Sequence, residues 1–302
     1  MEPQAQVPPP EEPAERQTTP FLVLQFFIFP MAIVAVCVTV FAVFGLIASE
    51  GRSARDYVAE IRTGGQNRRW QAAFELSKVL QGGRDPELRD PAFVADVISL
   101  FEASEQDDPR VRRYLALALG RLGDRAAVPA LRAAARASDA DSETVIYALW
   151  SLGTLGDASA LPDLVQLAGH QDRGIRKASV HALGAFDSSE AVDALRAALS
   201  DPADDVRWNA ALALGRRGDA AARPVLAQML DRAALQKVQV SDGSGIEGVS
   251  DEQAEEILIQ AIVVAGAGYD PALRTALEGL RDTDPSLRVR DAAQRALASF
   301  GD

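Results

Sequence analysis

Apolar residues in the downstream part of the chain recur at helical spacing, in pairs of short runs. In residues 108–136 the first run is Val111, Leu115, Ala118, Leu119 and Leu122. Gly123 and Asp124 interrupt the pattern, and a second run follows with Val128, Leu131 and Ala135. Apolar positions three or four residues apart lie on one face of a helix, and a glycine followed by a polar residue ends one. The stretch predicts two short antiparallel helices, each with one apolar face.

The same two-helix pattern returns along the chain and defines a repeat. Its marker is a glycine near the end of the first helix, at Gly120, Gly153, Gly184 and Gly215, with spacings of 33, 31 and 31 residues. A turn residue follows three positions later, at Gly123, Gly156, Asp187 and Gly218, and a proline near the start of the second helix recurs at Pro129, Pro162 and Pro224. Because neither helix of a unit can bury its apolar face alone, such units stack in a row.

The repeated motif is Asp-Pro-x-Val-Arg, then Ala-Leu-Gly-x-x-Gly-Asp, then Val-Pro-Ala-Leu. It resembles the HEAT repeat, specifically the short bacterial type known from phycobilin lyases, over residues 66–302. The resemblance implies an all-α fold, an α-solenoid of stacked HEAT-like helical hairpins. HEAT-like solenoids are mostly interaction scaffolds, so it also implies protein partners. The repeat type suggests a bilin-lyase-like activity as an enzymatic alternative, although this fold hosts unrelated functions.

One long uncharged segment precedes the repeats. Residues 21–47 carry no charged side chain, and as a helix they would span about 40 Å, more than the roughly 30 Å hydrocarbon core of a membrane. We therefore expect one transmembrane helix at 21–48, broken near Pro30. A cleaved signal peptide is disfavoured, because the segment is too long and the tail before it is acidic.

The charges that flank this segment predict its orientation. The arginines soon after it are Arg52, Arg55, Arg62, Arg68 and Arg69, whereas Arg16 is the one basic residue before it. By the positive-inside rule, the solenoid is expected in the cytoplasm and the protein in the inner membrane as a single-pass protein. Residues 1–20 contain six prolines and four glutamates, which predicts a disordered acidic tail.

Two further segments complete the expected organisation. Residues 49–65 are expected to form a juxtamembrane helix and linker, since Ser53 is a plausible N-cap for a short helix and Gly64 and Gly65 end it. Residues 235–250 are an insertion in the repeat, with alternating valines before a turn rich in glycine and serine. A small β-hairpin or a flexible loop is expected there. As a protrusion on a rigid scaffold, it is a candidate for partner contact.

Composition narrows the function. The 302-residue chain has a formal net charge of −12, which argues against nucleic-acid binding. Its single cysteine excludes an internal disulfide and a cysteine-based metal site. Nucleophile-elbow, phosphate-loop and dinucleotide-binding motifs are absent from the sequence. We expect no catalytic residues, no metal, no cofactor and no small-molecule substrate.

Three side chains and one recurring arginine are expected to be structural. His181 aligns with Trp150 in the preceding repeat, which predicts a partly buried, hydrogen-bonded histidine. Trp150 and Trp208 are expected in the core. The recurring arginine, at Arg112, Arg176, Arg207 and Arg290, has aspartates close by and predicts a ladder of contacts between neighbouring repeats.

A cluster of arginines gives the one candidate binding surface. Between residues 110 and 136 seven arginines are opposed within that span only by Asp124. Arg125, Arg132 and Arg136 fall on one side of the second helix, which in HEAT-like solenoids usually lines the concave surface, and Arg113 and Arg121 lie on the first. A solvated face is the simpler interpretation. The alternative is a site for an acidic partner segment or for anionic lipid headgroups.

These observations together predict a membrane-anchored, non-enzymatic HEAT-repeat scaffold for protein-protein interaction, with membrane proteins as the expected partners. The alternative is an accessory subunit of a larger membrane complex, such as a transporter or an energy-converting assembly. The two differ in whether affinity lies in the solenoid or in the apolar helix.

Overall fold

The computed structural model describes residues 28–48, 52–81, 88, 90–137, 140–241, 246–268 and 270–299. The predicted tail at 1–20 and the first residues of the predicted span lie outside this set. The chain divides into two compact units, Met1–Ser53 and Ala54–Asp302.

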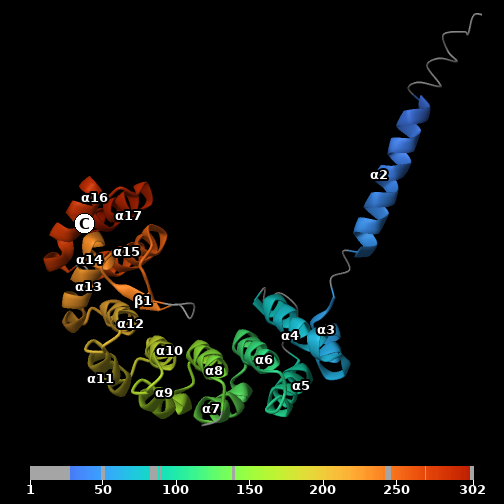
Figure 1. Ribbon diagram of the computed structural model, residues 1–302, viewed down its shortest axis with the longest axis horizontal. Coiled ribbons are helices and arrows are strands. Elements are labelled where there is room, and N and C mark those ends of the chain that lie inside the picture. The colour runs from blue at the N-terminus through green and yellow to red at the C-terminus, as the bar shows by residue number, and fades with distance from the viewer. Residues whose placement is uncertain are drawn as a thin grey trace, which may run out of the picture. The chain divides into compact units, whose positions relative to one another are not determined.

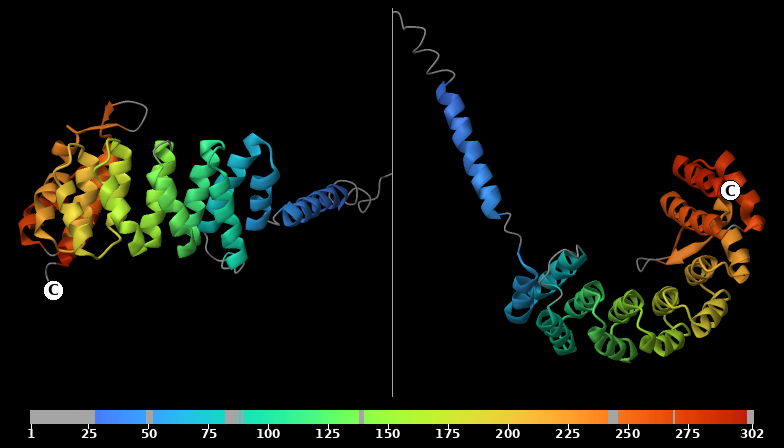
Figure 2. Two further views of the ribbon diagram at one scale, coloured as in Figure 1. Left: turned by 90° about the horizontal axis from the view of Figure 1, so that it is seen from below. Right: turned by 180° about the vertical axis from the view of Figure 1, so that it is seen from behind.

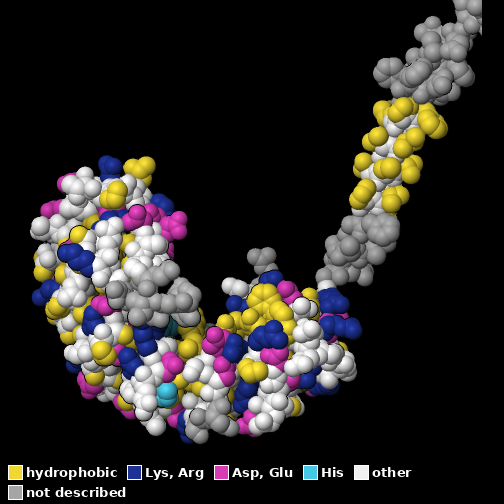
Figure 3. All heavy atoms as spheres, viewed as in Figure 1, with side chains coloured by type: hydrophobic (Ala, Val, Ile, Leu, Met, Phe, Trp, Pro, Cys, Tyr) yellow, Lys and Arg dark blue, Asp and Glu magenta, His cyan; other side chains and the backbone are white. Residues whose placement is uncertain are grey.

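The first unit contains helix α2, Phe29–Ala48. Pro30 lies in its first turn, where the missing N–H removes no helical hydrogen bond. The described side chains from Ile28 to Val43 are all exposed, Phe41 at 80%, and the helix surface in Figure 3 is almost wholly hydrophobic. Over the residues that the structure describes, none of the helices combines the length and apolarity of a membrane span.

The second unit is a row of helical hairpins, and the predicted all-α solenoid is confirmed. Its helices are α3 (Ala54–Thr63), α4 (Gln66–Gln81), α5 (Pro91–Ala103), α6 (Pro109–Leu122), α7 (Val128–Arg136), α8 (Ser142–Leu155), α9 (Leu161–Leu167), α10 (Arg173–Leu183), α11 (Ser189–Ala198), α12 (Asp204–Gly215), α13 (Arg223–Met229), α14 (Arg232–Leu235), α15 (Asp251–Ala267), α16 (Arg274–Thr283) and α17 (Leu287–Ala298). Short 3-10 turns η3 (Arg125–Ala127), η4 (Ala158–Ala160), η5 (Ala220–Ala222) and η6 (Pro271–Leu273) precede α7, α9, α13 and α16.

The hairpins of this unit form an arc with two rows of helices (Figures 1 and 2). Helices α4, α6, α8, α10, α12 and α15 make the inner row, and α5, α7, α9, α11 and α13 make the outer row. One continuous core of leucine, alanine and valine side chains runs between the rows. Each hairpin therefore buries its apolar face against its neighbours, as the repeat pattern requires.

Three of the hairpins turn on a left-handed glycine followed by an aspartate. Gly123, Gly156 and Gly218 have φ of 72°, 59° and 69°, a conformation that only glycine adopts without strain. The next residue caps the following 3-10 turn: Asp124 accepts the N–H of Ala126 at 2.8 Å, and equivalent bonds form at Asp157 and Asp219. The turn residues aligned in the sequence thus have a defined role.

The other repeated glycine lets neighbouring inner helices touch. A Cβ added at Gly120 would lie 2.5 Å from Ser151 Oγ, and one at Gly153 would lie 2.8 Å from the Cα of Ala182. Real Cβ atoms do not approach so closely, so a side chain here would push the repeats apart. These glycines set the spacing of the inner row.

Helix α3 belongs to the solenoid and is no separate linker. Its Val58 and Ile61 are buried in the core. Arg55 donates to Asp90 at 2.5 Å, and Arg62 donates to Asp96 at 3.2 Å. Helices α4 and α5 cover this apolar face, so the solenoid begins at Ala54. The sequence pattern had predicted that it begins at residue 66.

The insertion at 235–250 contains a short hairpin. Strand β1, Gln239–Ser241, pairs antiparallel with β2, Ile246–Gly248, with Val240 opposite Glu247. The hairpin and α14 separate α13 from α15 along the chain. The connection from outer helix α13 to the next inner helix, α15, is therefore longer than the other connections of this kind.

Arginine–aspartate pairs connect successive repeats, and we call these pairs the arginine ladder. Arg113 donates from Nε and Nη2 to the carboxylate of Asp141 at 2.8 and 2.7 Å. Similar pairs between repeats are Arg132–Asp163, Arg196–Asp219, Arg223–Asp270 and Arg232–Asp284. Several of these aspartates also cap a helix or turn with the same carboxylate. One side chain therefore orients a helix start and holds the adjacent repeat.

The recurring arginine makes structural contacts, as the sequence predicted. Arg112 donates to the carbonyl of Phe101 at 3.4 Å, and Arg207 donates to the carbonyl of Asp201 at 2.6 Å. Arg176 binds the carboxylate of Asp201 with two hydrogen bonds. Most of these arginines bind the last residues before their own helix.

We expect Gly153→Ala to destabilise the protein by about 1–3 kcal/mol, because the added methyl group must displace α10. Gly279→Ala is the matched control: it is also helical, and a Cβ there meets nothing within 4 Å. The control should be neutral or more stable by up to about 1 kcal/mol. Urea unfolding of both full-length variants measures the difference. Equal effects would contradict close packing at Gly153.

Asp141 should make stability depend on acid pH. Burial alone would raise the pKa of this carboxyl, but hydrogen bonds from Arg113 and Thr144 outweigh it and lower the pKa from 3.8 to about 2. A group whose pKa is lower in the folded state stabilises the protein above its unfolded pKa, and this contribution disappears as pH falls from about 4 to about 2.

We therefore expect Asp141→Asn to flatten the acid dependence of unfolding and to lose on the order of 1 kcal/mol at neutral pH. Asparagine caps helices nearly as well as aspartate, so the change mainly removes charge. Urea unfolding between pH 2 and pH 7 is the measurement. Asp291→Asn, which breaks an exposed pair within one helix, should leave the slope as in the wild type.

Candidate partner-binding site on the inner face

Aromatic side chains form a row across the inner helices. Phe74 on α4, Tyr114 on α6 and Tyr147 on α8 contact one another edge to face, with ring centroids 5.1 and 6.2 Å apart. One turn beyond Tyr147, Trp150 stacks on His181 of α10 at 4.5 Å with an interplanar angle of 22°. We call these five residues the inner aromatic row. Figure 3 shows a hydrophobic patch on this side of the unit near α4.

Trp150 was expected in the core, and that expectation is wrong. Its side chain is 49% exposed, whereas Trp208 on α12 is 7% exposed and buried as predicted. Trp150 points to the inside of the arc, where no following helix covers it. His181 is also exposed at the inner surface, and its Nδ1 lies 3.3 Å from Asn209 Oδ1. Desolvation by its surroundings lowers the pKa of His181, against a smaller opposite effect of the Asn209 hydrogen bond.

The row ends in a cavity of about 840 Å³ along α12 and α15, which we call the α12–α15 groove. Its apolar lining includes Trp150, Trp208, Leu212, Ile257 and Val263. Val263 is 61% exposed. This volume is within the range of binding pockets, and exposed apolar side chains of this size mark interaction sites.

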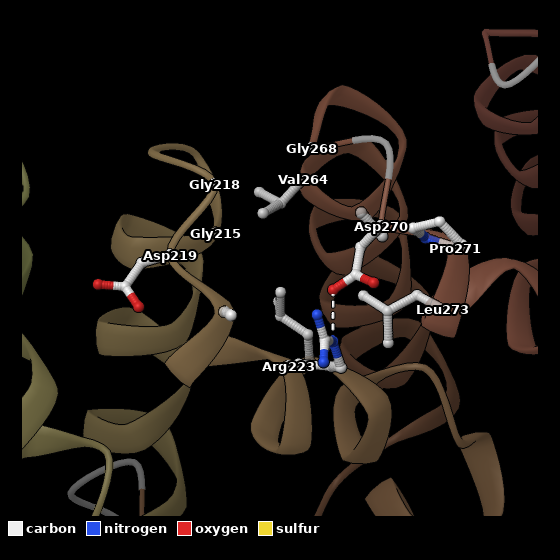
Figure 4. A pocket seen from close by; sticks show the side chains of 12 residues that line it. Gly215, Gly218, Asp219, Arg223, Val264, Gly268, Asp270, Pro271 and Leu273 are labelled. Atoms are coloured by element: carbon white, nitrogen blue, oxygen red, sulfur yellow. Dashed lines mark hydrogen bonds and ion pairs between the residues drawn. The ribbon is translucent and has the colours of Figure 1, made fainter.

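The groove lies where the insertion interrupts the repeat. Val249, at the end of the inserted segment, lines it. A second cavity of about 230 Å³ lies at the other end of the same junction, bordered by Gly215 and Val264 (Figure 4). There Arg223 Nε binds the carboxylate of Asp270 at 2.6 Å. The inner row is therefore least closely packed between α12 and α15.

Polar groups lie on both walls of the groove. Lys177 and Arg216 line the wall made by α10 and α12, and Gln253, Glu256 and Gln260 line the wall made by α15. Lys177 lies 3.3 Å from Asp205, while no described residue forms an ion pair or hydrogen bond with the Arg216 guanidinium. Burial, and then the charge of Arg217, lower the pKa of Arg216.

The predicted arginine cluster does not gather into one site. Helix α7 lies in the outer row (Figure 1), so the expectation that it lines the concave surface is wrong. Arg132 Nε donates to Asp163 at 2.6 Å, and Arg136 Nη1 lies 3.6 Å from the same carboxylate. Arg125 is 69% exposed and lies 4.0 Å from Asp157.

The two cluster members on α6 face neighbouring repeats. Arg113 binds Asp141 of the following repeat, and Arg121 donates to the carbonyl of Ser77 in the preceding one at 2.5 Å. The acceptor groups that these two arginines bind therefore lie in adjacent repeats and not within residues 110–136. Binding of an acidic partner or of lipid at these arginines stays a prediction.

A metal site has no support in the geometry: among the described residues, no three histidine, cysteine, aspartate or glutamate side chains are grouped to hold an ion. The groove combines apolar area with the imidazole of His181, the cations Lys177 and Arg216, and the carboxylates Asp205 and Glu256. Such a lining suits an amphipathic group.

The two tryptophans should separate binding from stability. Trp208→Ala is expected to cost about 3–5 kcal/mol, because it empties a core position. Trp150→Ala should cost about 1 kcal/mol or less, since it removes one stacked ring from the surface. Urea unfolding of the two variants measures this. A large loss for Trp150→Ala would assign that side chain to the core.

Comparison with known proteins agrees with this fold. A family model described as HEAT repeats matches residues 96–183, 135–207 and 162–239. No curated protein is similar enough in sequence to match.

Three solved structures illustrate the likeness. The CpcE–CpcF complex of phycocyanin lyase from Nostoc sp. PCC7120 is 22% identical, with 84% of this chain and 97% of that chain covered and a TM-score of 0.53. An archaeal HEAT-like repeats protein from Thermococcus onnurineus NA1 is 14% identical, with 83% and 98% covered and a TM-score of 0.46. A designed armadillo repeat protein in complex with the peptide (KR)4 is 19% identical, with 82% and 100% covered and a TM-score of 0.42. The protein carries HEAT repeats, and its second unit is an all-α HEAT-repeat solenoid.

Proposed function

We propose that this protein is a membrane-anchored, non-enzymatic scaffold that holds a segment of a protein partner against the inner face of its solenoid. The observation that carries the proposal is Trp150, which is half exposed beside an apolar groove. The ring is not covered as a core side chain would be, and it adjoins other exposed apolar side chains of the groove, such as Val263; a contiguous exposed apolar surface of this kind marks an interaction site.

The shape of the unit supports a polypeptide partner. HEAT-like and armadillo-like solenoids expose a long inner surface that suits extended contact with proteins. Here that surface carries the inner aromatic row from Phe74 to His181. Aromatic side chains contribute large contact areas at low entropic cost, and they dominate protein interfaces.

The anchor is proposed from the chemistry of α2. Its described side chains are apolar on every side and all exposed to solvent. A helix that is hydrophobic all round is stabilised by burial in a protein core or a bilayer, and the side chains described from Ile28 to Val43 are not buried by any described part of the chain. We propose residues 21–48 as the span, in the inner membrane, with the solenoid in the cytoplasm on the side of Arg52 and Arg62.

An accessory subunit of a larger membrane complex is the second candidate. The same exposed apolar surface of α2 favours it, because such a helix can pack against other transmembrane helices. A bilin-lyase-like activity is the enzymatic alternative, favoured by the fold likeness to the phycocyanin lyase complex. Absence of tetrapyrrole binding to the purified protein would remove that alternative.

The proposal predicts that a C-terminally tagged full-length protein stays in the membrane fraction after an alkaline carbonate wash. Purified in mild detergent, it should retain a defined protein partner in stoichiometric amount, identified by mass spectrometry. Trp150→Ala should reduce the retained partner at least about tenfold, as expected for an interface hot spot. Leu287→Ala, which changes an exposed leucine on α17, is the control and should retain it.

Replacement of residues 21–47 with an unrelated span separates the two candidates. Partner retained after replacement supports the scaffold, and partner lost supports the subunit. A wild-type protein released by the carbonate wash would contradict the anchor. Unchanged partner binding by Trp150→Ala would contradict the use of the inner face.

A further inference from the structure

We propose that the α12–α15 groove binds an extended peptide segment that places an aromatic or aliphatic side chain against Trp150 and Trp208 and a carboxylate on Arg216. This inference rests on the proposed function and names the chemistry of its partner. It assigns a specific ligand group to a side chain that the fold itself does not use.

Arg216 carries the electrostatic part of the inference. It lines the groove beside Leu212 and Val264, and within the described chain its guanidinium has no ion pair or hydrogen bond. Its neighbour Arg217, in contrast, donates to the carbonyls of Gly184 and Phe186 at 2.8 and 3.0 Å. Arg216 is therefore an exposed cation without a structural role in the described chain, and partial desolvation at the edge of the groove lowers its pKa.

A carboxylate is the group that best compensates such a cation. Guanidinium and carboxylate form short paired hydrogen bonds, which are stronger where water is partly excluded. On the same wall Lys177 is paired with the carboxylate of Asp205 at 3.3 Å, so Arg216 is the cation of that wall with no ion pair among the described residues. The opposite wall carries Glu256, which accepts a hydrogen bond from Gln260 at 3.3 Å.

The positions of Arg216 and Glu256 determine at which end of the groove a bound carboxylate lies. Gly215 packs directly against Val264, so Arg216 lies near the end of α15 that follows Val264. Glu256 lies eight residues earlier, about 12 Å along the helix axis. A bound carboxylate is therefore attracted to the end of the groove near Arg216 and repelled from the end near Glu256.

The apolar lining and the amide side chains favour an extended polypeptide. The groove follows α12 from Asp205 to Arg216, about 16 Å, which matches about five residues of extended chain. Gln253 uses its Oε1 to cap α15, and Gln260 uses its Nε2 on Glu256. One amide donor and one amide acceptor remain on this wall to pair with the backbone of a peptide.

The stacked pair of Trp150 and His181 supplies a flat surface at the side of the groove. Trp208 and Leu212 form part of its floor. Together they fit one planar or branched apolar side chain, of the kind that anchors peptides in aromatic-lined grooves. The expected motif is an aromatic or aliphatic residue a few positions from an aspartate, a glutamate or a C-terminal carboxylate.

The test uses the full-length protein in nanodiscs and a random nonapeptide display library as the probe. Enriched peptides are synthesised and their affinities are measured by fluorescence anisotropy. We expect an excess of acidic residues near an aromatic or aliphatic residue, and a loss of about 10- to 100-fold in affinity for Arg216→Glu. Trp150→Ala should weaken the same peptides, whereas Arg274→Glu, on α16 and outside the groove lining, should bind as the wild type does.

A charge exchange makes the assignment specific. Replacing the acidic residue of an enriched peptide with lysine should abolish binding to the wild type and restore it to Arg216→Glu within about threefold. Arg216→Gln serves as a second variant with no reversed charge, and circular dichroism confirms that each variant is folded. Restoration by the exchange would place the carboxylate on Arg216.

Three outcomes would overturn the inference. They are no enriched peptide at all, enriched peptides without acidic residues, and peptides that bind Arg216→Glu as well as they bind the wild type. In each case a partner that still depends on Trp150 in the co-purification experiment leaves the scaffold function standing. If partner retention does not depend on Trp150 while the peptides still bind as expected, the scaffold function is overturned and the peptide-binding inference stands.

Discussion

The solenoid depends on aspartates that bind two groups at once. Asp141 begins α8 by accepting the N–H of Thr144, and it also receives the guanidinium of Arg113 from the previous repeat. Asp219 and Asp270 do the same at the 3-10 turns. Because the cap fixes the carboxylate, the arginine meets a preorganised acceptor and loses less entropy than in a surface ion pair. The arginine ladder thus ties the start of one helix to the position of the neighbouring repeat.

The glycine contacts complement this ladder on the inner side. At Gly120 and Gly153 the absence of a side chain brings successive inner helices into backbone contact. Charged pairs join neighbouring helices in both rows, Arg113–Asp141 in the inner row and Arg132–Asp163 in the outer row, whereas the glycine contacts lie in the inner row. The arginine–aspartate pairs and the glycine contacts together hold the helices in an arc with a continuous core. Residues that take part in neither set of contacts form the inner surface of the arc.

Much of the fold could be predicted because both sets have sequence signatures. The glycines and aspartates recur at fixed spacing, so the hairpins and their stacking follow from Gly120 to Gly218 alone. The start of the solenoid was harder to predict from the sequence, because α3 carries no such marker. Only the burial of Val58 and Ile61 in the structure shows that it belongs to the solenoid.

The site could be predicted only in part. The arginines between residues 110 and 136 seemed unopposed because their acids, such as Asp141 and Asp163, lie about thirty residues away, in the next repeat. Trp150 seemed buried because a repeat pattern does not say which helix forms the inner row. One signal was present in the sequence. The position of Leu117, Trp150, His181 and Leu212 changes its chemistry from repeat to repeat, and its exposure changes too, since Trp150 and His181 are exposed whereas Leu212 is buried.

The contact between Gly215 and Val264 has a mechanical consequence. It lies between two cavities, the α12–α15 groove on one side and the smaller cavity of Figure 4 on the other. Helices that touch at one place and are separated by space on either side rotate about that place more easily than helices packed along their full length. We therefore expect the repeats from α15 onward to rotate relative to the rest of the solenoid more easily than helices that are packed along their full length.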